Sequence, residues 1–151
     1  MSPPESATGM LLYLELHDSY LSELEFEGGS AVVTLNPAYI HRWHFERGTW
    51  TGTGWRERLE ITIVGLGAEQ TTVTVPIPCQ LSGGALSVQG RALENLIPLD
   101  KTILGPFQLL LQCGGAEPSR IAGKGIEFTM AGNAQFVEAL PQEFAPDVRA
   151  T

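Results

Sequence analysis

The sequence predicts an all-β fold, a single-domain antiparallel β-sandwich or barrel with at most one short helix. Three observations lead to this prediction. Apolar and polar residues alternate with period two in many short runs, which is typical of half-buried strands. The 17 glycines and 10 prolines place turn signals between most of these runs. The runs are also not separated by the crossover helices of about ten or more residues that a parallel sheet requires.

The expected strands follow one another from residue 10 to residue 140. The first two runs alternate leucine with polar residues. The third passes through Pro37, where we expect a bulge or a sheet edge because proline has no N–H for the ladder. Consecutive leucines in 107–112 indicate a strand covered on both faces. The expected strands span residues 12–16, 21–26, 31–45, 59–63, 71–75, 85–88, 103–112, 121–130 and 135–140.

The other segments complete the predicted organisation. Residues 91–96, shortly before Pro98, are the one expected helix. Residues 1–9 are expected to be a mobile lead, residues 10–140 the β domain and residues 141–151 a flexible tail. A jelly-roll-like and a calycin-like closure of the sheet both fit this pattern.

Composition excludes several classes of function. The chain carries 9 basic and 17 acidic residues, a net charge of −8, which argues against nucleic acid because phosphate binding requires clustered Lys and Arg. No apolar run approaches the roughly 20 residues of a membrane span, and the N-terminus lacks a basic secretory n-region. We therefore expect a cytoplasmic protein, with Cys79 and Cys113 as two buried thiols.

Sequence motifs predict neither a cofactor nor a catalytic group. Three Gly-x-Gly turns lack the third glycine of a dinucleotide fingerprint. They begin at Gly52, Gly65 and Gly123. His17, Asp18 and Ser19 are the residue types of a catalytic triad, but neighbours on an extended chain point to opposite faces. This tripeptide is therefore interpreted as a turn.

The histidine spacing predicts no metal site. His41 and His44 would converge on a helix, but in an extended segment they diverge, which leaves His44 and Glu46 as the pair on a shared face. The pattern decides nothing about a carboxylate pair for glycoside hydrolysis, because glutamate is common on solvated strand faces.

Aromatic residues concentrate in one segment. All three tryptophans lie within residues 43–55, which are rich in Gly and Thr and are expected to form a flexible loop. Trp and Arg are enriched at interface hot spots, and flat ring faces stack on sugars. The alternative is that these rings pack inside or cap the sandwich. The candidate binding residues of this segment are His41, Arg42, Trp43, His44, Trp50 and Trp55.

A second feature is an acidic stripe formed by Glu23, Glu25 and Glu27 on one strand face. Glu15 would join it if runs 12–16 and 21–26 paired as a hairpin. Like charges side by side destabilise a sheet by up to about 1 kcal/mol, and a cationic partner would relieve this repulsion. The alternative is a solvated face that protects a sheet edge from aggregation.

These features support two main hypotheses. The leading one is a non-catalytic acidic protein-interaction module, such as a bacterial accessory, inhibitor or immunity-type protein, that binds a basic protein partner. The stripe would steer association and the Trp segment would anchor it. The alternative is a small-molecule-binding, carbohydrate-binding or catalytic β-barrel whose pocket is lined by residues 41–55. Self-association through an exposed strand edge, which would give a homo-oligomer, is a third hypothesis.

Overall fold

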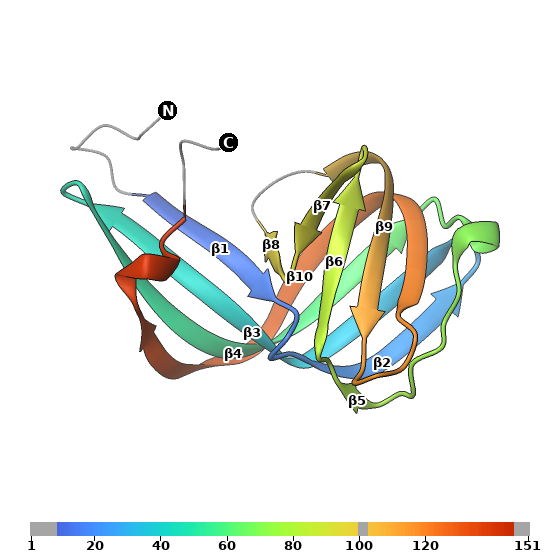
Figure 1. The fold of residues 1–151 in the computed structure, drawn as a ribbon, viewed down its shortest axis with the longest axis horizontal. Coiled ribbons are helices and arrows are strands. Elements are labelled where there is room, and N and C mark those ends of the chain that lie inside the picture. The colour runs from blue at the N-terminus through green and yellow to red at the C-terminus, as the bar shows by residue number, and fades with distance from the viewer. Residues whose placement is uncertain (1–8, 100–102, 147–151) are drawn as a thin grey trace.

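The computed structural model describes residues 9–99 and 103–146, and it confirms the all-β prediction (Figure 1). Ten strands form one large antiparallel sheet. The helical segments of the described residues are the single 3-10 turns η1 (Ala68–Gln70) and η2 (Gln142–Phe144). Across these residues no helix is long and apolar enough to cross a membrane. Most of the expected lead and the end of the expected tail lie outside the described ranges.

The strands are neighbours in the order β5-β2-β3-β4-β10-β9-β6-β7, and β1 pairs with both β3 and β8. Sandwich or barrel closure stays a prediction, because one continuous sheet carries all ten strands. The strand bounds are β1 (Gly9–Glu15), β2 (Tyr20–Glu27), β3 (Ser30–Glu46), β4 (Thr49–Val64), β5 (Cys79–Gln80), β6 (Gly83–Val88), β7 (Arg91–Glu94), β8 (Leu96–Pro98), β9 (Ile103–Gln112) and β10 (Ser119–Leu140).

The long hairpin of β3 and β4 divides the sheet into two parts. β2 pairs with the first part of β3, whereas β1 pairs with the second part, residues 39–45. β10 follows β4 along both parts. We call the second part, built from β1 and the adjoining portions of β3, β4 and β10, the wing. It projects to the left in Figure 1, away from β6, β7 and β9.

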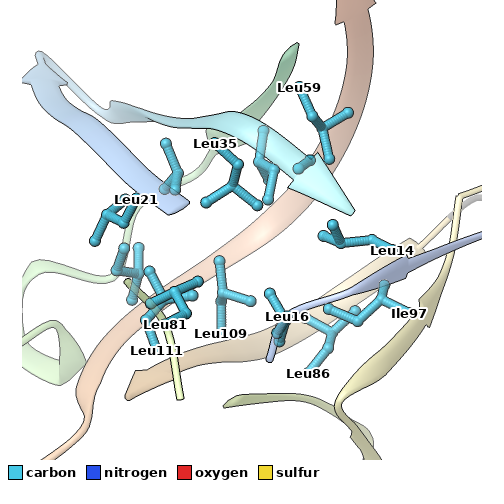
Figure 2. Packing of buried hydrophobic residues seen from close by; sticks show 14 of the residues in the cluster. Leu14, Leu16, Leu21, Leu35, Leu59, Leu81, Leu86, Ile97, Leu109 and Leu111 are labelled. Atoms are coloured by element: carbon cyan, nitrogen blue, oxygen red, sulfur yellow. The ribbon is translucent and has the colours of Figure 1, made fainter. Parts of the chain in front are cut away.

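The hydrophobic core lies where the sheet curls back on itself. Leucines of β2, β3 and β4 face leucines of β6 and β9, and the end of β1 and β8 close one side (Figure 2). Full burial of such a side chain contributes about 1.5–3 kcal/mol. The residues labelled in the core are Leu14, Leu16, Leu21, Leu35, Leu59, Leu81, Leu86, Ile97, Leu109 and Leu111.

A β-bulge in β3 changes which side chains face the core. Leu35 pairs with Leu59, but the next pair is Ala38 with Glu57, so β3 holds one extra residue there. The bulge falls at Pro37, as predicted from its missing N–H. Val33 and Leu35 are buried in the core before the bulge, and Ala38 and Ile40 take over this role after it. We call this side of the sheet the core face and the opposite side the groove face.

The expectations for two segments are wrong, because the strand pairing in the structure differs from the pairing that the local pattern suggests. Residues 43–55, expected to form a flexible loop, are instead the end of β3 and the start of β4, and the two strands pair with each other across the turn at residues 47–48. Residues 71–75 form no strand and contribute only an isolated bridge between Thr72 and Arg120.

The predicted helix over 91–96 is also wrong. Residues 91–94 form β7, which pairs with β6 through a tight turn at Gln89 and Gly90, both with positive φ. Such a two-residue turn matches the twist of a hairpin. Runs 12–16 and 21–26 do not pair with each other, because β1 lies against β3 and β8 while β2 lies against β3 and β5. Glu15 is therefore separate from the acidic stripe.

The two cysteines form a disulfide, which corrects the expectation of two separate thiols. Their Cα atoms are 6.5 Å apart. The Ser82 N–H donates to the Gln112 carbonyl, so the backbone ladder itself brings the segment after β5 beside the end of β9. The bond connects residues that lie 34 positions apart in the sequence.

Glycines in β4 allow aromatic rings to lie flat on the wing. A Cβ atom at Gly52 would overlap the ring of Trp43, and one at Gly54 would overlap the Tyr39 hydroxyl group. We expect Gly52→Ala to lower the free energy of unfolding by about 1–3 kcal/mol, the usual cost of overpacking. Chemical denaturation followed by tryptophan fluorescence measures this change.

Gly83→Ala is the matched control, because a Cβ atom there meets nothing within 4 Å and the residue also lies in a strand. Its stability should match or exceed that of the wild type. Equal destabilisation of both variants would contradict the packing argument.

Candidate functional site

A groove with a volume of about 1140 Å³ lies on the groove face of the wing. Its floor is formed by side chains of β1, β3, β4 and β10. One end of the groove, which we call its head, is lined by the turn at residues 17–18, by residues 80–82 and by residues 95–96. Phe144 of η2 lies at the other end. The groove therefore joins the wing to loops around the core.

Glu15 and His41 form the buried pair at the head of the groove. The register places Glu15 opposite Tyr39, so His41 is its diagonal neighbour on the same face. His41 Nε2 lies 3.1 Å from Glu15 Oε1, and the two side chains are only 7% and 17% exposed. The hydrogen bond from His41 lowers the pKa of Glu15 to about 2, although burial acts in the opposite direction. Glu15 is thus a carboxylate at neutral pH.

The turn after β1 brings two further titratable groups to Glu15. Ser19, which is fully buried, holds this turn: its hydroxyl donates to the Glu15 carbonyl and accepts from the Tyr39 N–H. His17 Nδ1 lies 3.2 Å from Asp18 Oδ1, and the His17 N–H donates to Asn95 Oδ1 at 2.7 Å. The hydrogen bond between the carboxyl groups of Asp18 and Glu15 raises the pKa of Asp18.

Tyr39, Arg56 and Glu138 continue the polar floor of the groove. Burial, with the nearby charge of Glu138, raises the pKa of Tyr39 to about 12, so its phenol stays a hydrogen-bond donor at neutral pH. Its ring meets His41 edge to face, with ring centroids 5.4 Å apart. The groove therefore combines carboxylate acceptors with phenol and guanidinium donors.

This arrangement has two chemical capacities. Glu15 and Asp18 have pKa values shifted in opposite directions, which is the relation expected of an acid and base pair. The ligand atoms of Glu15, His17 and Asp18 also lie within 4.8 Å of one another, a spacing that a metal ion could bridge. The histidine spacing in the sequence predicts no such cluster, and it places only His44 with Glu46 on a shared face.

The predicted alternation in β3 is confirmed. Tyr39, His41, Trp43 and Phe45 are buried on the groove face, whereas His44 is exposed on the opposite face. Of the six candidate residues in the aromatic segment, His41 lines the groove.

The structure separates the three tryptophans. Trp43 is 1% exposed and lies over Gly52, while Trp50 packs against Phe45 near the hairpin tip with ring centroids 5.0 Å apart. Trp55 lies on the core face. They do not form a common surface.

Arg42 and Trp55 form a small cluster on the core face of the wing, the face that also carries His44. The guanidinium carbon of Arg42 lies 4.4 Å from the centroid of Trp55, and Arg42 Nη2 lies 3.2 Å from Glu57 Oε2. The exposed Phe136 meets the edge of Trp55. These contacts fix the orientation of Arg42.

The acidic stripe exists and is wider than predicted. Glu23, Glu25 and Glu27 are exposed on β2. The strand register adds Glu60 of β4 and Glu127 of β10 to the same face, which is the continuation of the groove face. We call these five glutamates the acidic face. Arg58, 3.3 Å from Glu60, partly neutralises it.

Sequence reasoning missed most of the groove. It rejected His17 and Asp18 because it assumed an extended chain, whereas the turn directs their side chains toward Glu15. The sequence does contain a signal for this arrangement. His17 and Asp18 follow directly after the strand that ends at Glu15, and a turn at that point keeps their side chains near the Glu15 carboxylate. Tyr39, Arg56 and Glu138 required knowledge of the register.

The Glu15 pKa gives a testable pH dependence. Because its folded pKa of about 2 lies below the ordinary glutamate value of 4.5, Glu15 stabilises the fold above pH 4.5, and this contribution is lost as the pH falls toward 2. The raised pKa of Asp18 offsets part of this effect. We expect Glu15→Gln to lower the free energy of unfolding by on the order of 1–2 kcal/mol at neutral pH. Between pH 4.5 and 2, this free energy, measured by urea unfolding, should fall less steeply in the variant than in the wild type.

Glu69→Gln, an exposed site in η1, is the control for this measurement and should retain the wild-type acid dependence. An unchanged acid slope in Glu15→Gln would show that the Glu15–His41 pair does not stabilise the fold.

No family model, curated protein sequence or solved structure matches this chain.

Proposed function

We propose that the protein is a binding module that recognises a basic protein partner through the acidic face and the adjoining groove. The observation that carries this proposal is the continuity of the two surfaces. β4 has no extra residue between Glu60 and Gly54, so Glu60, Arg58, Arg56 and Gly54 lie on one face that runs from the acidic face into the groove.

Charge arrangement supports a cationic partner. Glu23 and Glu60 lie in one cross-strand row on alternate strands, separated by Thr34. Alternate strands are about 10 Å apart, close to the Debye length of about 8 Å at physiological salt. The negative potentials of the glutamates therefore overlap. Such a field raises association rates with oppositely charged partners by about 10- to 1000-fold, and salt weakens it.

The groove adds a place for a side chain from the partner. Glu15, Asp18 and Glu138 line it, and Arg56 is a basic residue in the same lining. A lysine or arginine side chain could enter from the acidic face and be accepted by these carboxylates. Arginine forms paired hydrogen bonds with carboxylates, so it fits this lining best.

A small-molecule ligand is the second candidate. The groove volume, about 1140 Å³, slightly exceeds the roughly 300–1000 Å³ of typical ligand pockets, so the groove is large enough for such a ligand. Its lining also mixes polar groups with Leu96, Val137, Leu140 and Phe144. The tryptophans expected to line such a pocket are absent from this lining, which weakens the carbohydrate version of the hypothesis.

The disulfide bears on the compartment. Disulfides persist in oxidising compartments and are rare in the cytosol, so the Cys79–Cys113 pair favours an oxidising compartment over the expected cytoplasm.

The acidic face can be tested with a defined probe. We expect a synthetic deca-arginine peptide to bind the full chain in calorimetry, with an affinity that falls as salt rises. The triple variant Glu23→Lys, Glu25→Lys, Glu27→Lys should weaken this binding at least tenfold, because it reverses the charge of the stripe.

The control is the triple variant Glu69→Lys, Glu94→Lys, Glu117→Lys. It changes the net charge equally at exposed sites in η1, β7 and the loop before β10. Equal weakening by both triple variants would overturn the proposal, because it would show attraction to overall charge only. Absence of binding at low salt would overturn it as well.

A further inference from the structure

We propose that Glu15, His17, Asp18 and His41 form a binding site for one divalent transition-metal ion at the head of the groove. This proposal goes beyond the binding of a basic partner: it uses none of the five glutamates of the acidic face, and it shares Glu15 and Asp18 with the groove lining described above. It rests on the convergence of two imidazoles and two carboxylates from a turn and the strand beside it.

The donor atoms already lie close together. Those of Glu15, His17 and Asp18 are within 4.8 Å of one another. His41 is not part of this group of three; its Nε2 atom lies 3.1 Å from Glu15 Oε1, and it becomes a fourth donor when an ion replaces the hydrogen bond between them. Donors bound to one ion at about 2.0–2.2 Å are separated by about 3–3.5 Å in tetrahedral geometry. Small side-chain rotations would therefore bring the donors of Glu15, His17 and Asp18 onto one ion, and His41 would join them through its contact with Glu15.

The backbone that carries the donors is held in place. Ser19 bonds to the backbone of Glu15 and Tyr39, and Asn95 accepts from the His17 N–H. His41 is fixed by its place in β3, between β1 and β4, and by the edge-to-face contact with Tyr39. A pre-organised donor set loses little conformational entropy when it binds an ion.

The charges around the cluster favour a cation. The ion-pair partners of Glu15 and Asp18 in the described part of the chain are His41 and His17. These imidazoles are charged only when protonated, so two adjacent carboxylates lack a permanently charged partner. A divalent ion would supply that charge and use the neutral imidazoles as ligands.

The donor types select the class of ion. Two imidazole nitrogens with two carboxylate oxygens suit Zn²⁺, Co²⁺, Fe²⁺ or Mn²⁺, whereas Ca²⁺ and Mg²⁺ prefer oxygen-only sites. His17 and Asp18 are exposed, so an ion can enter from the groove.

Calorimetry on the tag-free full chain tests the proposal after the protein has been treated with EDTA and the chelator has been removed. We expect ZnCl₂ and CoCl₂ to bind with one ion per chain and at least tenfold more tightly than CaCl₂ or MgCl₂. The visible absorption of bound Co²⁺ reports its coordination by the donors. His17→Ala and Asp18→Asn, both at exposed positions, should each weaken Zn²⁺ binding at least tenfold while circular dichroism stays unchanged.

His44→Ala is the matched control, because His44 is an exposed histidine on the opposite face of β3. It should bind Zn²⁺ like the wild type. The proposal is overturned if neither Zn²⁺ nor Co²⁺ binds, or if His44→Ala weakens binding as much as His17→Ala. Binding of the deca-arginine peptide to the acidic face is measured separately, so failure of one proposal is distinguishable from failure of the other.

Discussion

The arrangement of this protein depends on one extra residue in β3. The bulge at Pro37 lets β3 bury Val33 and Leu35 in the core and then turn Tyr39 and His41 to the opposite face. Without it, the odd-numbered residues of β3 would stay on the core face along the whole strand, because side chains alternate strictly with period two. His41 would then lie on the core face, the face of Trp55, away from Glu15, and the groove would lose its buried histidine.

The bulge places bulky side chains of β3 on the groove face, and the neighbouring strand β4 provides the space for them. Four successive odd-numbered side chains of β3, three of them aromatic rings and one an imidazole, now lie on the wing, where β4 supplies Gly52 and Gly54 beneath Trp43 and Tyr39. Glycine weakens an isolated strand, but here it gives the rings room to pack on the backbone. The buried rings in turn exclude water from one side of the His41 imidazole. Local sequence choices in β4 therefore support a geometry that is set in β3.

The sequence predicted the fold class and most strands because period-two alternation and glycine or proline punctuation are local signals. It also located the bulge, since the missing N–H of Pro37 is a property of one residue. It missed the groove because Glu15, His17 and His41 come together through strand register, which no local pattern encodes. The assumption of an extended chain at His17 also concealed the turn. Strand pairing also explains why residues 91–94 form β7 instead of the predicted helix, because they pair with β6.

The acidic face and the groove raise one energetic question, which is why a stable sheet retains so much uncompensated charge. Exposed like charges cost only up to about 1 kcal/mol per pair, whereas the core strands behind them bury many leucines at about 1.5–3 kcal/mol each. Burial of core side chains therefore outweighs this repulsion in strands whose other face packs in the core, as β4 does through Leu59 and Ile61. The head of the groove differs, because Glu15 is largely buried there and its carboxylate accepts a hydrogen bond from the His41 imidazole. Solvent screens the exposed glutamates of the acidic face more strongly than it screens the largely buried Glu15. A bound cation would therefore gain more electrostatic free energy beside Glu15 than on the acidic face.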